Sequence, residues 1–321
     1  MRSILDSEPW IKSENCPICT SENIGFLYSG DRYDMKLSTY ICHECYFVFT
    51  NPYPSESLIL DFYENEYWNL YFKSSQTKNK DLLEARQTRC EGYYNFINRE
   101  VMLSGTVNQT CHLIDFGGGE GVFTKYLKES SKYKTYLFEP SVSERKLALD
   151  NNCADLVTFD ERQLIKTLVG NQQSSDLTIV SCIHVLEHLT DFPKFFNFLD
   201  NVLKYNDLIY IDVPNLLAYQ HVKEIHIAHK SHFSPNTLIQ LFCNYGYECA
   251  AIEEYEPSYH PASIRAIFRK VNKKVTMSYT EHVKLSLIQD IFSKISETAE
   301  IWNSPISRIK RKLKTALTHF I

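Results

Sequence analysis

The stretch that decides the fold is Leu113-Ile114-Asp115-Phe116-Gly117-Gly118-Gly119-Glu120-Gly121. Its first four residues form an apolar run that predicts a buried strand, and residues 123–129 have the periodicity of a helix. A glycine-rich turn between a strand and a helix lets a ligand approach the backbone closely, because no Cβ intervenes. The N-terminus of the helix then offers free N–H groups and the positive end of a dipole. We therefore expect this loop to bind a ligand.

Strands and helices alternate on both sides of this loop. Apolar runs at residues 135–138, 177–182 and 208–213 predict strands, whereas residues 143–151 and 192–202 have helical periodicity. Two late runs, 248–252 and 263–268, are typical of a closing antiparallel pair. Such alternation predicts an α/β fold with a mostly parallel, doubly wound sheet.

Length and composition limit the classes of protein. The chain has 321 residues, of which 44% are hydrophobic and 23% charged, as in ordinary globular proteins. Its formal net charge of -5 argues against non-specific binding of nucleic acid by the whole surface. We find no apolar run near the roughly 20 residues that span a bilayer and no signal-peptide core, so we expect a cytoplasmic protein.

Two acidic residues indicate which ligand the loop binds. A carboxylate at Asp115, directly before the first glycine, would repel phosphate and suits a cationic ligand such as the methionine moiety of S-adenosylmethionine. Glu139 follows the strand at 135–138, where an acidic residue accepts hydrogen bonds from ribose hydroxyls. Together they predict S-adenosylmethionine as the cofactor.

These motifs resemble those of the class I S-adenosylmethionine-dependent methyltransferases, which share a Rossmann-like, seven-stranded, mostly parallel sheet. Residues 181–189, Ser-Cys-Ile-His-Val-Leu-Glu-His-Leu, are similar to a stretch that follows the fourth strand in small-molecule members and faces the methyl group. The resemblance implies cofactor contacts, with Phe159 or Asp160 beside the adenine, by the following residues: Asp115, Gly117, Gly118, Gly119, Gly121, Glu139, Pro140, Phe159, Cys182 and His184.

Four of the ten cysteines form two C-x-x-C pairs near the N-terminus, Cys16 with Cys19 and Cys42 with Cys45. Each pair can place two thiolates on one tetrahedral metal ion, and the separation of the pairs suits a zinc ribbon. Four thiolates leave no open coordination position. The sequence therefore predicts a structural zinc ion.

The cysteine module narrows the resemblance to the deoxysugar C-methyltransferases, which act on nucleotide-linked sugars. It is followed by Asn51-Pro52-Tyr53-Pro54 and by a tyrosine-rich segment with Tyr63, Tyr67 and Ser74-Ser75, as in that group. The resemblance covers roughly residues 14–270 and lacks that group's C-terminal domain. It implies a sugar or polysaccharide precursor as substrate. Tyr63 and Tyr67 then either line the substrate pocket or serve as packing residues.

A histidine-rich loop between the fifth strand and the next helix holds candidates for the base. Aligning Phe233-Ser234 with the "EHxxYFS" stretch of the sugar methyltransferases puts His229 on their catalytic histidine. Ala228 replaces the family's glutamate, which makes O-methylation at least as plausible as C-methylation. His226 and His232 are candidate substrate contacts, and the three histidines together also suggest a metal site as an alternative. His184 and Glu187 are further catalytic candidates.

The sequence suggests four regions: a zinc module (1–54), a helical linker or substrate lid (55–105), the methyltransferase domain (106–270) and a helical C-terminal extension (271–321). A basic amphipathic helix after Ser304-Pro305 either contacts a membrane peripherally or packs on the domain. Alternative functions are an O- or N-methyltransferase of another small metabolite and a zinc-ribbon protein that binds nucleic acid. The sequence does not define the acceptor atom, the sugar or the oligomeric state.

Overall fold

The computed structural model describes residues 10–33, 35–62, 80–103, 105, 110–130, 132–173, 175–257, 260–273, 275, 283–304 and 307. The chain divides into two compact units. The cysteine unit comprises the described parts of Met1–Leu83, Asn215–Thr237 and Thr280–Ile321, and the glycine-loop unit those of Glu84–Pro214 and Leu238–Tyr279. The segment 215–237, predicted as part of the methyltransferase domain, therefore belongs to the cysteine unit.

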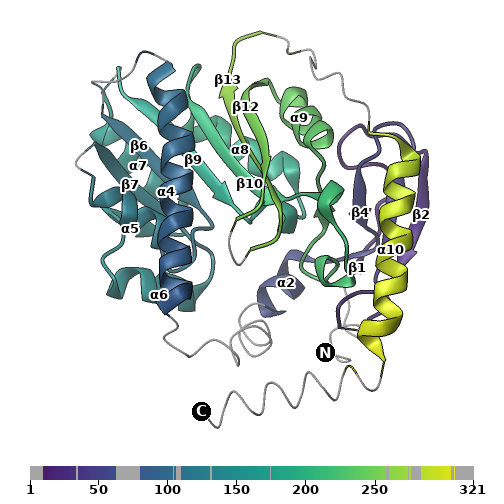
Figure 1. Cartoon of the computed structure of the whole chain (residues 1–321). Helices are drawn as coiled ribbons and strands as arrows, with labels where there is room; N and C mark the ends of the chain where they lie inside the picture. The colour runs from purple at the N-terminus through teal and green to yellow at the C-terminus, as the bar shows by residue number, and fades with distance from the viewer. Residues whose placement is uncertain are drawn as a thin grey trace. The chain divides into compact units, whose positions relative to one another are not determined.

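The glycine-loop unit is built on the predicted seven-stranded sheet, in the order β12-β13-β10-β9-β6-β7-β8 (Figure 1). The strands from β10 to β8 are mutually parallel, and β13 pairs antiparallel with both β10 and β12. The strands are β6 (Cys111–Phe116), β7 (Tyr133–Phe138), β8 (Leu156–Thr158), β9 (Leu177–Ile183), β10 (Leu208–Pro214), β12 (Tyr247–Tyr255) and β13 (Ser263–Lys270). The α/β fold is thus confirmed.

Helices connect these strands, and several begin at the residue types that cap helices. The helices are α4 (Lys80–Leu103), α5 (Val122–Lys128), α6 (Val142–Asp150), α7 (Glu161–Asn171), α8 (Phe192–Val202) and α9 (Pro235–Asn244). Ser141, Asp160 and Asp191 each accept a hydrogen bond from a backbone N–H of the first turn of α6, α7 and α8. These caps define the point at which each chain segment turns back from the sheet.

Helix α4 packs into the core of the glycine-loop unit. Tyr93, Phe96 and Ile97 on α4 are buried in one cluster with Leu113 of β6 and Tyr210 of β10. Their burial corrects the interpretation of residues 84–103 as a linker or lid, because the helix covers the sheet's apolar surface.

The cysteine unit contains a four-stranded antiparallel sheet, in the order β11-β4-β3-β2. Its strands are β2 (Ile24–Ser29), β3 (Ser38–Cys42), β4 (Val48–Thr50) and β11 (Ser231–His232), and a further pair joins β1 (Trp10–Ile11) to β5 (Tyr53–Pro54). Helix α2 (Glu56–Phe62) follows β5. Because β11 pairs with β4, the histidine-rich segment completes the sheet that begins in the cysteine module.

Helix α10 (Leu285–Asn303) packs on this same sheet, beside β2 (Figure 1). Phe292 lies against Tyr28, with ring centroids 5.7 Å apart, and the Trp302 indole N–H donates to the carbonyl of Arg32 at 3.0 Å. Residues 285–303 are therefore part of the cysteine unit's core and not a separate extension. The predicted basic helix after Ser304 falls on residues that, apart from 307, lie outside the described ones.

Among the helices that the structure describes, none has the length and apolar character needed to cross a membrane.

Candidate functional site

Asp115 lies beneath the glycine loop, at the end of β6. Its carboxylate accepts hydrogen bonds from the hydroxyls of Thr124 at 2.8 Å and Ser181 at 2.7 Å, and the residue is 2% exposed. Burial raises the pKa of the Asp115 carboxyl, and the two hydroxyl hydrogen bonds oppose that rise. This corrects the expectation that the carboxylate points toward a ligand: it ties the loop to β9 and α5.

Two glycines allow the loop to fold this tightly. A Cβ on Gly118 would lie 2.3 Å from the Asp115 carboxylate oxygen Oδ2. Gly121 has a φ of +78°, and a Cβ there would lie 2.2 Å from the thiol of Cys153. Gly117 and Gly119 also have positive φ values, of +72° and +58°. The glycines therefore serve the packing beneath the loop as much as the approach of a ligand above it.

Glu139, predicted to accept hydrogen bonds from the ribose, is the acidic residue whose side chain reaches the loop. From the end of β7, its Oε2 accepts the backbone N–H of Gly119 at 2.9 Å and its Oε1 that of Ser141 at 2.7 Å. Burial raises the pKa of Glu139, while these two backbone hydrogen bonds oppose the shift. A carboxylate offers about four lone-pair directions, so Glu139 retains capacity for two further donors.

Phe159 presents an apolar surface at the same edge of the sheet. Its side chain is 51% exposed, and its ring is tilted against that of Phe138, with centroids 5.3 Å apart. The guanidinium of Arg145 lies 5.6 Å above the Phe159 ring. Arg145 also donates to the carbonyl of the predicted contact Pro140, at 2.6 Å. A half-exposed ring beside Glu139's strand suits a flat aromatic ligand.

Cys182 and His184 lie at the end of β9, and only one of them has an accessible side chain. The thiol of Cys182 is completely buried, so only its backbone could contact a cofactor. His184 has an unusual φ of +52°, and its backbone N–H donates to the carbonyl of Asp212 at 2.8 Å. This geometry directs the imidazole out of the strand.

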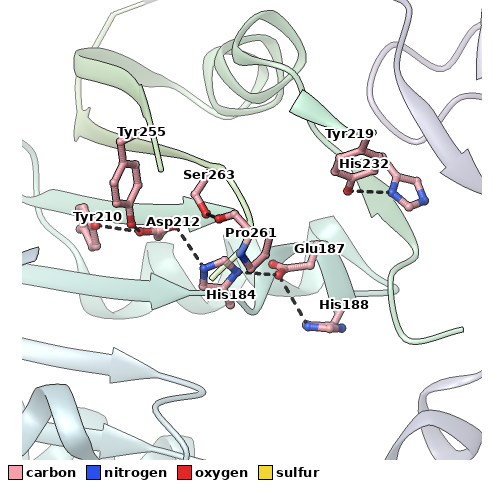
Figure 2. Close-up of polar contacts among 10 residues, drawn as sticks. All are labelled: His184, Glu187, His188, Tyr210, Asp212, Tyr219, His232, Tyr255, Pro261 and Ser263. Carbon is pink, nitrogen blue, oxygen red and sulfur yellow. Dashed lines mark hydrogen bonds and ion pairs between the residues drawn. The ribbon is translucent and has the colours of Figure 1, made fainter. Parts of the chain in front are cut away.

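The imidazole of His184 is held between two carboxylates (Figure 2). Its Nδ1 lies 3.3 Å from Glu187 Oε1 and its Nε2 lies 3.4 Å from Asp212 Oδ1. Burial alone would lower the pKa of His184, but the hydrogen bond to Glu187 and the charges of Asp212 and Glu187 outweigh it and raise the pKa. Because both ring nitrogens lie beside protein carboxylates, the geometry argues against the predicted role of His184 as a base. Glu187 orients this ring.

Two tyrosines complete this network. The hydroxyls of Tyr210 and Tyr255 both donate to Asp212 Oδ2, Tyr210 at 3.2 Å (Figure 2). Asp212 is fully buried, and burial raises the pKa of its carboxyl, with His184 and the tyrosine hydrogen bonds opposing. Sequence reasoning missed Asp212 and Tyr255. The available signal was an acidic residue within the apolar run Leu208–Pro214.

The four predicted cysteines of the cysteine unit meet at one point. The Sγ atoms of Cys16 and Cys45 lie 3.5 Å apart and those of Cys19 and Cys42 lie 3.4 Å apart, and all four lie within 4.8 Å of one another. The cysteines are free of disulfides. Such separations fit four thiolates about 2.3 Å from a central tetrahedral ion.

The histidine-rich loop also lies in the cysteine unit. The rings of His226 and His229 are 3.7 Å apart between centroids, and His229 and His232 are 6.4 Å apart. His232 is fully buried, with its Nδ1 3.2 Å from the hydroxyl of Tyr219 (Figure 2), which leaves it no surface for the predicted substrate contact. His226 is also buried, whereas His229 is partly accessible. The predicted contacts Tyr63 and Tyr67 lie outside the described residues.

The chain matches the model of a methyltransferase domain family over residues 83–252. This match covers more than half of the chain, and the chain belongs to that family. The family membership confirms the predicted enzyme class, an S-adenosylmethionine-dependent methyltransferase. The match begins within α4, in agreement with the packing of that helix in the core.

Solved structures with similarity to this chain include an S-adenosylmethionine-dependent methyltransferase from Archaeoglobus fulgidus, at 20% identity and a TM-score of 0.40, covering 74% of this chain and 94% of that one. Magnesium protoporphyrin IX methyltransferase from Synechocystis, with bound S-adenosylmethionine, has 11% identity and a TM-score of 0.44, covering 67% and 96%. A methyltransferase from Leishmania major has 17% identity and a TM-score of 0.43, covering 58% and 73%. No curated protein matches the chain.

Proposed function

We propose that this methyltransferase transfers the methyl group of S-adenosylmethionine to a sugar, either nucleotide-linked or part of a surface-polysaccharide precursor. The observation that carries the cofactor assignment is Glu139, whose buried carboxylate meets the glycine loop at Gly119. The sugar assignment rests on the arrangement of the sequence, in which a cysteine module precedes the methyltransferase domain and a histidine loop follows β10.

The residues present fit S-adenosylmethionine. The Gly117–Gly121 backbone would hold the methionine moiety, Glu139 would accept the ribose hydroxyls, and the half-exposed ring of Phe159 would cover the adenine. The cofactor supplies an electrophilic methyl group on a sulfonium. The chain's own residues orient the acceptor, exclude water and take up the proton that the acceptor loses.

We assign the proton-accepting role to His229. Its ring is the accessible one of the loop's histidine pair, and an imidazole titrates near neutral pH. Ala228, where the sugar C-methyltransferases carry glutamate, is buried and has no ionisable group. Removal of a hydroxyl proton demands less of a single histidine than removal of a carbon-bound one, so this loop favours O-methylation.

We assign the cysteine cluster to a structural zinc ion. Cys16, Cys19, Cys42 and Cys45 supply four soft ligands at tetrahedral separations and fill the coordination sphere. The ion would stabilise the small sheet β2–β4, whose strands flank the cysteine pairs.

A panel of nucleotide-linked sugars tests the acceptor. Purified enzyme with S-adenosylmethionine should add the mass of one methyl group to at least one sugar. His229→Ala should abolish this turnover and leave the cofactor affinity unchanged by calorimetry. His221→Ala, a partly buried histidine of the same unit outside the histidine loop, is the control. Methylation of small metabolites but of no sugar would refute the sugar assignment, and undiminished turnover in His229→Ala would remove that residue as the base.

A further inference from the structure

The topology of the glycine-loop unit defines where ligands meet. After β6, the next two strands of the chain, β7 and β8, are added on one side of it. The following strands, β9 and β10, are added on its other side. The crevice at the carboxyl ends of β6 and β9 is therefore the topological switch point, at which open α/β sheets bind their ligands. The glycine loop follows β6 and His184 follows β9. They adjoin through Val185, since a Cβ on Gly117 would lie 2.7 Å from its Cγ2 atom.

The imidazole ring of His184 is held in place at this point. Glu187 and Asp212 engage its two nitrogens, and the tyrosine hydroxyls hold Asp212 in place. The side chain of His184 is still 17% exposed.

A second histidine, His260, lies against the ring of His184. It belongs to the connection between β12 and β13, and its ring centroid is 4.2 Å from that of His184. Its Nδ1 is buried and has no hydrogen-bond partner among the described residues. Burial, the His184 charge and the Arg89 charge lower the pKa of His260 to about 2, so the ring is neutral at physiological pH. A buried nitrogen without a partner is costly unless a ligand satisfies it.

Methyl transfer creates a need for such a nitrogen. The acceptor atom must direct a lone pair at the methyl carbon, in line with the bond that breaks, so the acceptor is best held through a hydrogen that it does not lose. A neutral imidazole nitrogen can accept that hydrogen. The two nitrogens of the neighbouring His184 ring instead lie beside the carboxylates of Glu187 and Asp212.

We propose that His260 binds the methyl acceptor, with Nδ1 accepting a hydrogen that the acceptor keeps during the transfer. This hydrogen belongs to a hydroxyl beside the attacking one or is the second hydrogen of an attacking amine, and the proton that is lost goes to the proposed base. This inference rests on the proposed methyl transfer and narrows the acceptor to an O–H or N–H group. His260 orients the acceptor and undergoes no covalent step. The His184 network fixes the neighbouring ring so that His260 remains neutral.

Nitrogen NMR of the full chain tests the ring states directly. The sample is labelled with ¹⁵N-histidine and saturated with S-adenosylhomocysteine, and His260→Phe and His184→Phe assign the two rings. At pH 7 we expect His260 to be neutral, with a bare Nδ1. A charged His260, or one protonated at Nδ1, would overturn the inference. Failure of S-adenosylhomocysteine to bind would instead count against the proposed function.

A pair of variants separates the acceptor nitrogen from the ring stack. His260→Phe keeps a ring on His184 but loses the nitrogen, whereas His260→Asn places an amide oxygen near the position of Nδ1. With the sugars that the panel identifies, His260→Phe should lower kcat/KM for the acceptor about 10- to 100-fold, the usual effect of losing a buried hydrogen bond. His260→Asn should stay within a few-fold of wild type, and neither should change the cofactor affinity. Equal losses in both variants would assign His260 to packing alone.

Discussion

The two units of this chain bring their functional residues together in different ways. In the glycine-loop unit, the loop, Asp115 and Glu139 come from one β-α-β segment of the sequence, residues 111–139. In the cysteine unit, β4 pairs with β11, and α10 covers the sheet, so three distant segments build one core. A site made from one local motif can be found in the sequence, whereas a core assembled from distant segments cannot.

The largest effect that the comparison predicts is loss of the metal from the cysteine unit. Cys42→Ser removes one thiolate of the cluster, and structural zinc contributes on the order of 10 kcal/mol to folding in small modules. We expect the number of zinc ions per chain, measured by inductively coupled plasma mass spectrometry, to fall from one to near zero. The variant should also unfold at a lower temperature than the wild type. Cys243→Ser, in α9 of the other unit, should retain the metal. Full zinc content in Cys42→Ser would refute the assignment.

The next effect falls on the glycine loop. Gly118→Ala places a methyl group 2.3 Å from the Asp115 carboxylate, so the loop must shift. We expect the affinity for S-adenosylmethionine to fall about 100-fold or more, since misplaced loop atoms lose several contacts together. Gly170→Ala, in α7 with no atom within 4 Å of the new Cβ, should bind normally and gain about 0.5–1 kcal/mol of stability. Equal affinities in the two variants would show that the loop is not the cofactor site.

Helix α10 tests whether the cysteine unit is one cooperative core. Ile288→Ala removes a fully buried side chain and should cost about 2–5 kcal/mol in urea unfolding. Its neighbour Leu287 is 44% exposed, and Leu287→Ala should change stability by less than about 1 kcal/mol. A small cost for Ile288→Ala would restore the view of α10 as a detached extension.

These contrasts also show what the sequence could reveal. The mostly parallel α/β sheet, the cysteine cluster and the position of Glu139 at the end of a strand followed from alternation and spacing. Asp115 was located correctly, but its carboxylate faces inward, because the side that a strand residue faces depends on strand pairing. Tyr255 reaches Asp212 through the register of β13, which pairs with both β10 and β12, and no local pattern encodes that register. No sequence motif around His260 indicated a functional role for that residue.

The smallest predicted effect is a pH dependence beside the glycine loop. Burial and the charges of Glu120 and Glu139 raise the pKa of Glu144 to about 7, above its ordinary value of 4.5. The folded protein therefore binds more protons than the unfolded chain between these values, so this group makes stability fall as the pH rises from about 4.5 to 7. Glu144→Gln should melt at nearly the wild-type temperature at pH 5 and at a higher temperature at pH 8. If the difference in melting temperature between Glu144→Gln and the wild type does not grow from pH 5 to pH 8, the raised pKa of Glu144 is contradicted.

The most direct test of the central claim is calorimetric titration of S-adenosylmethionine into wild type and Glu139→Gln. We expect one binding site per chain in the wild type. In Glu139→Gln we expect an affinity about 10- to 100-fold weaker, because the amide accepts fewer hydrogen bonds from the ribose than the carboxylate does. Glu129→Gln, an exposed residue at the end of α5, should bind as the wild type does. No binding by the wild type, or identical binding by Glu139→Gln, would contradict the assignment of this loop as the S-adenosylmethionine site.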